Sequence, residues 1–135
     1  MEANHKIIAH RTITADELSL VRVTAQAMAL DAGLDNERAH RFALAVHELA
    51  TNSIEHAGGS GELTVVQDDR RMVYAEIADH GPGIREPVDL TAPSPDVLRG
   101  RGLWLSYQLS DRMFIETGPN GTTVRVEFDS DRTVA

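Results

Sequence analysis

The sequence contains no cysteine and a single lysine, Lys6, among its 135 residues. Without cysteine, a disulfide framework, a zinc ribbon, an iron–sulfur cluster and thiol chemistry are all excluded, which is compatible with a reducing cytoplasm. Lys6 alone cannot supply a P-loop, which requires Gly-x-x-x-x-Gly-Lys-Ser/Thr, or the strand lysine beside the nucleotide in a eukaryotic-type protein kinase. Any nucleotide chemistry must therefore use another design.

Long apolar runs and an excess of basic residues are also missing. No window approaches 18 apolar residues, and residues 1–6 lack the apolar core of a signal peptide. We therefore expect a soluble, cytoplasmic protein without a membrane partner. The 21 acidic residues outnumber the 13 basic ones, which gives a formal net charge of -8. Because binding to a phosphate backbone needs a basic surface, direct contact with nucleic acid is not expected.

The length and composition predict a single domain over residues 1–135. Its apolar content of 41% is ordinary for a globular protein. A chain of this length buries roughly two thirds of the surface that its unfolded form exposes, so one core is enough for stability without disulfides or a structural metal.

Apolar spacing predicts the order of helices and strands. The predicted elements are a strand at 6–13, a helix from Thr14 or Asp16 to Gly33, a helix from Asp35 to Gly58, a hairpin of 62–67 and 72–78, a helix at 103–109, and a hairpin of 113–117 and 122–128. This order predicts an α+β fold, a two-layer α/β sandwich whose mixed, mostly antiparallel sheet has its helices on one face. Residues 79–102 hold four of the five prolines and four of the ten glycines, which indicates a long functional loop or a disordered segment.

The first helix carries two apolar stripes on opposite sides. One stripe consists of Leu18, Val21, Ala25, Met28, Ala29 and Ala32, and the other of Leu20, Val23, Ala27 and Leu30. We expect a helix buried between two layers, and a homodimer through an exposed second stripe is the alternative.

The second helix contains Glu48, Asn52 and His56 at a spacing of i, i+4, i+8, with Glu55 beside them. Side chains at this spacing lie along one stripe of a helix. A carboxylate and a carboxamide one turn apart can place a general base next to a Mg²⁺ ligand, but a solvated helix edge would show the same pattern.

Three glycine-containing segments could surround a flat, charged ligand. Asp79-His-Gly81-Pro-Gly83 follows a predicted strand. The Asp79 carboxylate could accept a hydrogen bond from an exocyclic amine of a ligand. An ordinary Gly-Pro turn without a ligand would have the same sequence. Gly100-Arg-Gly102 precedes a helix start, where backbone N–H groups and Arg101 could meet phosphates. Gly121-Thr122 enters the last strand, as in an ordinary hairpin.

In this order, these segments resemble the N, G1, G2 and G3 boxes of the Bergerat-fold (GHKL, HATPase_c) ATPases, over residues 35–128. The phrases at 48–57, Glu-Leu-Ala-Thr-Asn-Ser-Ile-Glu-His-Ala, and at 100–105, Gly-Arg-Gly-Leu-Trp-Leu, most resemble the anti-sigma factor serine/threonine kinases of bacteria. The resemblance implies ATP and Mg²⁺ as cofactors.

The resemblance also implies a role for each matching residue. Asn52 is implied as the Mg²⁺ ligand, Asp79 as the group that binds the adenine amino group with support from Thr122, and Glu48 as the general base that takes a proton from a substrate serine. The remaining ATP-binding positions are Gly81 and Gly83 at the base pocket, and Gly100, Arg101, Gly102 and Leu103 over the phosphates, with an ATP lid at residues 84–99.

Family members of this kind hold a sigma factor in one state and phosphorylate a small anti-anti-sigma (STAS) protein in the other. The resemblance therefore implies partner switching that controls transcription. Two alternatives stay open: an ATP-binding regulatory module without kinase activity, and the detached ATPase domain of a histidine kinase. His47 and His80 depart from the usual pattern, and we interpret both as solvated surface histidines rather than catalytic or pH-sensing groups.

Overall fold

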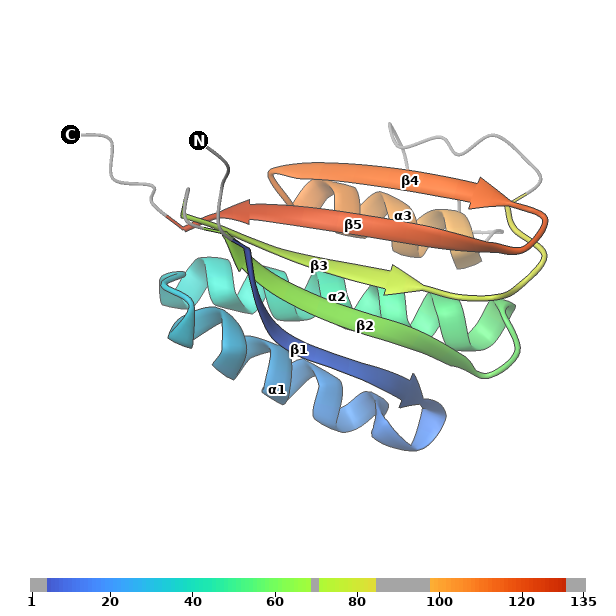
Figure 1. Cartoon of the computed structure of the whole chain (residues 1–135), viewed down its shortest axis with the longest axis horizontal. Coiled ribbons are helices and arrows are strands. Elements are labelled where there is room, and N and C mark those ends of the chain that lie inside the picture. Colours follow the sequence, from blue (N-terminus) through green and yellow to red (C-terminus); the bar gives the residue numbers. More distant parts are fainter. Residues whose placement is uncertain (1–4, 69–70, 85–97, 131–135) are drawn as a thin grey trace.

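The computed structural model describes residues 5–68, 71–84 and 98–130, and in them one antiparallel sheet carries helices on one face (Figure 1). The sheet order is β1-β2-β3-β5-β4. The strands are β1 (His5–Thr14), β2 (Ser60–Asp68), β3 (Met72–Ala78), β4 (Arg112–Gly118) and β5 (Gly121–Asp129). The helices are α1 (Leu18–Asp31), which follows the short 3₁₀ helix η1 (Ala15–Glu17), α2 (Asn36–His56) and α3 (Leu98–Leu109).

The predicted α+β sandwich and the predicted order of elements are confirmed. All four strand pairings of the described sheet are antiparallel, so it contains no parallel pair. The start of the last helix was predicted wrongly: α3 begins at Leu98 rather than 103, and Gly100 and Gly102 lie inside the helix. Residues 85–97, which hold most of the predicted loop and ATP lid, lie outside the described residues.

The central helix α2 begins and ends where its sequence signals predict. The side chain of Asp35 accepts a hydrogen bond from the N–H of Arg38 over 2.8 Å, which caps the helix start. At the other end, Gly58 and Gly59 take positive φ values of 91° and 95°, a backbone conformation that favours glycine and stops the helix.

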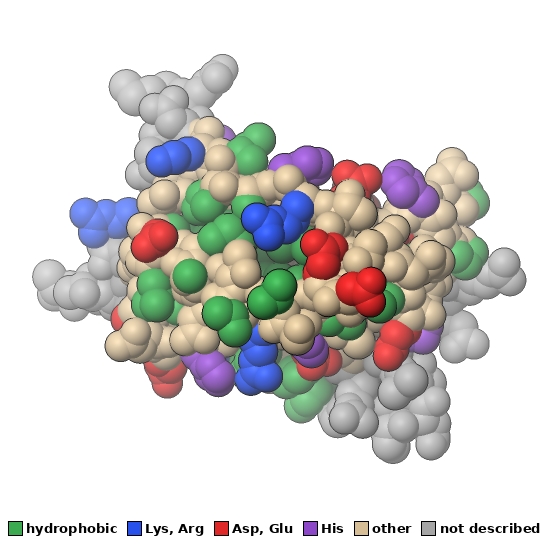
Figure 2. All heavy atoms as spheres, turned by 90° about the horizontal axis from the view of Figure 1, so that it is seen from below, with side chains coloured by type: hydrophobic (Ala, Val, Ile, Leu, Met, Phe, Trp, Pro, Cys, Tyr) green, Lys and Arg blue, Asp and Glu red, His purple; other side chains and the backbone are tan. Residues whose placement is uncertain are grey.

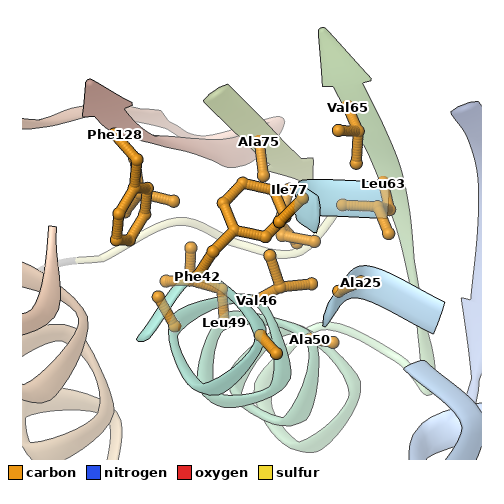
Figure 3. Packing of buried hydrophobic residues seen from close by; sticks show 14 of the residues in the cluster. Ala25, Phe42, Val46, Leu49, Ala50, Leu63, Val65, Ala75, Ile77 and Phe128 are labelled. Carbon is orange, nitrogen blue, oxygen red and sulfur yellow. The ribbon is translucent and has the colours of Figure 1, made fainter. Parts of the chain in front are cut away.

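The core lies between α2 and the sheet. Phe42 of α2 meets Phe128 of β5 edge to face, with ring centroids 5.3 Å apart. Figure 3 shows Phe42, Val46 and Leu49 pointing from α2 toward the sheet, and all three are buried. Because this side of α2 is used for packing, the flank that carries Glu48 and Asn52 can serve a site.

Helix α1 lies at one side of the molecule, next to β1 and α2, and is not buried between two layers (Figure 1). Its first stripe is buried, including Val21, Ala25 and Ala29. Leu20 and Val23 of the second stripe are 64% and 68% exposed, so the prediction of burial on both sides was wrong. No helix in the described part of the chain is long and apolar enough to span a membrane.

Candidate functional site

One side of the candidate site is formed by the polar stripe of α2, which consists of Glu48, Asn52 and His56. Glu48 and Asn52 are one helical turn apart and partly exposed, with the Glu48 side chain at 34%. Within the described residues, the Asn52 side chain makes no hydrogen bond. His47 Nδ1 lies 4.0 Å from Glu48 Oε2. The structure therefore presents a carboxylate and an uncommitted carboxamide side by side.

Helix α3 lies beside Glu48 at its glycine-containing first half. A methyl group at Gly102 would lie 3.8 Å from both the carbonyl oxygen and Oε1 of Glu48. The other end of α3 is fixed to α2, because Arg41 donates through Nε to the carbonyl oxygen of Leu109 and through Nη2 to that of Gln108, both over 3.2 Å. A cation on these terminal carbonyls also complements the helix dipole. The two helices therefore hold Gly102 against Glu48.

Leu103, next to Gly102, is fully buried and packs in the core. It therefore holds α3 in place and does not face an open site. Gly100 lies in the first turn of α3, where backbone N–H groups lack partners within a helix. The side chain of Arg101 lies outside the described part of the chain.

Asp79 follows β3 and is held by the backbone on both sides. Its Oδ1 accepts hydrogen bonds from the N–H groups of Gly81 and Thr122, each over 3.0 Å. In the described residues, its Oδ2 accepts none. The carboxylate is thus fixed in orientation with one oxygen left for a ligand donor, such as an exocyclic amine.

The glycines after Asp79 allow close packing of protein segments. A Cβ at Gly81 would come within 2.8 Å of Ala57 Cβ at the end of α2. Gly83 has a positive φ of 87° and lies against the carbonyl group of Gly118 in the β4–β5 turn. These contacts bring the Asp79 loop to the C-terminal end of the α2 stripe, at His56. Gly102 lies instead near Glu48. Glu48 precedes His56 by eight residues, which is about 12 Å along the helix.

Thr122 is buried and joins a small hydroxyl network. Its Oγ1 lies 2.8 Å from Oγ1 of Thr117, which in turn accepts a hydrogen bond from the N–H of Ile84 over 2.8 Å. Thr117 was not among the predicted site residues. Its pairing with Thr122 across the last hairpin is the signal that could have found it, because directly opposed residues share a face.

Two ring nitrogens near these segments are buried without a partner. They are Nε2 of His56, at the end of the α2 stripe, and Nε1 of Trp104 in α3, and neither has a hydrogen bond in the described residues. Such groups are costly to bury unless something pairs with them. His80, by contrast, has an 84% exposed side chain with Nε2 3.6 Å from Glu62 Oε2, which agrees with a surface histidine.

The oxygen-bearing side chains of the candidate site fit a nucleotide whose phosphates bind a metal ion better than they fit a metal ion held by protein groups alone. No group of three or more His, Cys, Asp or Glu side chains in the described residues could hold a metal ion. Mg²⁺ commonly uses one or two protein oxygens and completes its shell with phosphate oxygens and water. Asn52 could supply a protein oxygen, and Asp79 Oδ2 could accept a hydrogen bond from a nucleotide base.

Two hollows on the described surface lie elsewhere. One of about 70 Å³ lies between α1 and β1, and one of about 640 Å³ lies on the outer face of β3, β4 and β5. Neither is lined by Glu48, Asn52 or Asp79. Among the described residues, the candidate site therefore rests on the convergence of these side chains.

Comparisons with known proteins agree with this fold. The RsbU and RsbW domains of Rv1364c from Mycobacterium tuberculosis are similar in structure, with a TM-score of 0.65 and 18% identity, covering 90% of this chain and 32% of that one. The histidine kinase domain of a blue-light-activated histidine kinase from Erythrobacter litoralis has a TM-score of 0.59 and 19% identity, covering 87% of this chain and 67% of that one. A search of curated proteins found no match.

At these identities the two solved structures show a shared fold. The profile of the histidine kinase-like ATPase domain matches residues 12–128, from β1 to the end of β5. That range contains α2, the Asp79 loop and α3. The chain therefore belongs to the histidine kinase-like ATPase domain family.

Proposed function

We propose that this chain binds ATP with Mg²⁺ and transfers the γ-phosphoryl group to a serine or threonine of a protein partner. The observation that carries the proposal is that two segments contact the polar stripe of α2 at different points. Gly102 of α3 lies beside Glu48, and the loop that follows Asp79 lies beside Ala57 at the end of α2. A nucleotide lying along this stripe would have its base at Asp79 and its phosphates near Glu48 and Asn52.

Asp79 is the proposed adenine-binding group. Its Oδ1 is occupied by two backbone donors, and Oδ2 can accept from the exocyclic amine of adenine. Thr122 supports this arrangement through its backbone N–H and through its hydroxyl contact with Thr117. Gly81 and Gly83 keep the loop in the position that places the carboxylate.

The phosphates would lie at the start of α3. Backbone N–H groups in its first turn, from Leu98 to Arg101, point toward the helix start and have no partners within the helix. Arg101 would add positive charge, and residues 84–99 would act as the ATP lid. Asn52 would hold Mg²⁺, which when bound neutralises charge on the phosphoryl group being transferred.

Glu48 is the proposed general base. Its carboxylate is 34% exposed and lies beside Gly102, which carries no side chain of its own. It would accept the serine proton as the serine oxygen attacks the γ-phosphorus, while the bond between the γ-phosphorus and the β,γ-bridging oxygen breaks and ADP leaves. Because phosphoryl transfer depends mainly on positioning and charge neutralisation, one base, one metal and a helix start are enough.

The proposed role is partner switching in the cytoplasm, by a single domain formed by residues 1–135. The chain would hold a sigma factor in one state and phosphorylate an anti-anti-sigma (STAS) protein in the other, without contacting nucleic acid itself. The motif resemblance at 48–57 and 100–105 and the structural similarity to an RsbW domain support this role.

The test has two parts. Calorimetric titration with ATP, with and without Mg²⁺, should show binding that depends on Mg²⁺, and Asn52→Ala should remove the Mg²⁺-dependent part. Radiolabelled ATP incubated with the chain and a cognate STAS protein should label the STAS protein, and Glu48→Gln should abolish labelling while ATP still binds. ATP binding without any transfer would instead indicate a regulatory module that is not a kinase.

The second candidate is the ATPase domain of a histidine kinase, which the similarity to the Erythrobacter litoralis domain favours. Phosphohistidine is labile in acid and phosphoserine is stable. Acid treatment of the labelled partner therefore separates the two, and loss of the label would favour the histidine kinase.

A further inference from the structure

The hydroxyl group of Thr117, in the β4–β5 hairpin, contacts two separate segments around Asp79. Its Oγ1 accepts a hydrogen bond from the N–H of Ile84 over 2.8 Å, and it lies 2.8 Å from Oγ1 of Thr122. Ile84 lies in the loop that follows β3, and Thr122 lies at the start of β5. In Figure 1 this loop runs beside the β4–β5 turn. One side chain therefore connects the end of the loop to the start of β5.

The loop after β3 depends on such contacts for its shape. It contains two glycines, which restrict the backbone less than other residues do. Its start is fixed because the N–H of Asp79 donates to the carbonyl oxygen of Thr122 over 2.9 Å. Its end is fixed by Ile84, whose side chain packs against the core and whose N–H donates to Thr117. Without the contact at Ile84, the glycines would allow the loop to move.

The position of Thr122 also depends on the Thr117 hydroxyl. Thr122 is only 5% exposed, and burying a hydroxyl group without a partner is costly. Among the described residues, Thr117 is the hydrogen-bond partner of the Thr122 hydroxyl. The N–H of Thr122 in turn donates to Asp79 Oδ1 over 3.0 Å. A shift of Thr122 would therefore move the Asp79 carboxylate.

We propose that Thr117 is a positioning residue for the purine base and makes the site prefer a base that carries an exocyclic amine. This role rests on the proposed binding of ATP. Asp79 Oδ2 accepts well from an adenine amine when the carboxylate is held in one orientation. The Thr117 hydroxyl holds the loop after Asp79 and Thr122 together, so it acts on the base through these two segments.

Two variants separate the hydroxyl of Thr117 from the rest of its side chain. Thr117→Val removes the hydroxyl and keeps the branched shape, whereas Thr117→Ser keeps the hydroxyl. Because Thr117 is exposed, both variants should fold with little change in stability. Urea unfolding checks this expectation.

Calorimetry with Mg²⁺ measures the affinity of each chain for ADP and for inosine diphosphate. The two ligands share the ribose and phosphates, but inosine carries a carbonyl oxygen in place of the amine and has no donor for Asp79 Oδ2 there. The original chain should prefer ADP. Thr117→Val should weaken ADP binding about 3- to 10-fold and change inosine diphosphate binding much less, so that the preference narrows. Thr117→Ser should keep the original preference.

Thr64→Val is the matched control. It also removes a threonine hydroxyl from a strand, one that lies 2.7 Å from His10 Nδ1. Thr64 lies in β2, which pairs with β1 at the opposite edge of the sheet from β4. Figure 2 views the molecule from this side, where α1 and β1 lie. This variant should bind both nucleotides as the original chain does.

Amide hydrogen exchange in the chain without nucleotide tests the contact independently of ATP. The amide of Ile84 should exchange faster in Thr117→Val than in the original chain, because its N–H loses an acceptor. The rate should be unchanged in Thr117→Ser and in Thr64→Val.

The role of Thr117 is overturned if Thr117→Val keeps the original preference for ADP, or weakens both nucleotides equally, as a general loss of structure would. It is also overturned if Thr117→Ser behaves like Thr117→Val, or if exchange at Ile84 is the same in Thr117→Val and in the original chain. Each of these results leaves ATP binding by the original chain intact. Absence of ADP binding by the original chain would instead overturn the proposed function, and the role of Thr117 with it.

Discussion

Asp79 and Thr122 are joined by two hydrogen bonds. The N–H of Asp79 donates to the carbonyl oxygen of Thr122 over 2.9 Å, and the N–H of Thr122 donates to Oδ1 of Asp79 over 3.0 Å. The end of β3 is therefore fixed to the start of β5, and the orientation of the carboxylate is set by backbone geometry. This preorganisation leaves Oδ2 in a defined place for a ligand.

Asp79→Asn tests whether that oxygen accepts from adenine. The amide keeps the shape of the side chain and one acceptor for Gly81 and Thr122, but it replaces Oδ2 by an NH₂ donor. We expect ATP affinity to fall about 10- to 100-fold, the worth of a hydrogen bond to a charged group, with little loss of stability. Calorimetry measures the affinity, and Glu76→Gln, on the outer face of β3, is the control. Unchanged affinity in Asp79→Asn would contradict the assignment.

Gly102→Ala should separate stability from binding. Glycine inside a helix costs about 1 kcal/mol relative to alanine, and a methyl group here would make ordinary contacts of 3.8 Å with Glu48. We therefore expect the free energy of unfolding to rise by about 0.5–1 kcal/mol. ATP affinity should fall, because the methyl group occupies space proposed for the phosphates.

Urea unfolding and ATP titration of the same preparation measure both effects of Gly102→Ala. His40→Ala, at an exposed position of α2, is the control for helix propensity, and it should gain stability without losing ATP affinity. A Gly102→Ala variant that is more stable and binds ATP as well as the original chain would show that phosphates do not lie beside Glu48.

The regular elements could be predicted because local signals and burial agree in them. In α2, the Asp35 cap, the buried Phe42 and Val46, and the stop at Gly58 all favour the same helix. Helix α3 was predicted five residues too short at its start, because two glycines lower its intrinsic propensity. Its packing on α2 overrides this preference, with Ser106 Oγ donating to the carbonyl oxygen of Ala45 over 3.4 Å.

The helical spacing within the candidate site was predictable from the sequence, but the contacts that orient Asp79 were not. The spacing of Glu48 and Asn52 puts them on one face of a helix, and the structure keeps that relation. The bonds that orient Asp79 come from Gly81 and from a strand 43 residues away, at Thr122. Contacts at that separation depend on sheet register, which one sequence does not specify.

Tyr74→Phe should change the alkaline stability of the protein. Burial raises the pKa of the Tyr74 phenol above its ordinary value of 10.0, and Arg125, 3.8 Å above the ring, offsets part of this effect. The folded chain therefore holds the phenol proton more tightly than the unfolded chain does. The stabilising effect is complete below pH 10, and the free energy of unfolding falls as pH rises through the raised pKa.

Urea unfolding at a series of alkaline pH values measures this slope. We expect a shallower fall for Tyr74→Phe than for the original chain, since phenylalanine keeps the ring over which Arg125 lies but carries no proton. Tyr107→Phe, at a 44% exposed position of α3, is the matched control and should keep the original slope. Equal slopes for all three chains would contradict the role of Tyr74.

Arg112→Met should destabilise the β4–β5 hairpin. Arg112 donates through Nε to Glu127 Oε1 over 2.7 Å and through Nη2 to Asp129 Oδ1 over 2.6 Å. The hydrogen bonds to Asp129 and Glu127 raise the pKa of Arg112, so it stays charged. The Glu127 side chain is only 9% exposed, and losing a partner leaves a buried carboxylate with less compensation. We expect a loss of about 1–2 kcal/mol, reduced from the fully buried case because the Arg112 side chain is 45% exposed.

A double-mutant cycle with Glu127→Gln tests the cause of that loss. If the cost of Arg112→Met comes from the buried charge, then adding Glu127→Gln should recover most of it, because the amide is neutral and leaves no uncompensated carboxylate beside Arg125. Lys6→Met, which removes an exposed cation from β1, is the control and should change stability by less than about 0.5 kcal/mol. Strictly additive losses in the double variant would mean that Arg112 stabilises the hairpin through packing of its aliphatic part and not through its charge.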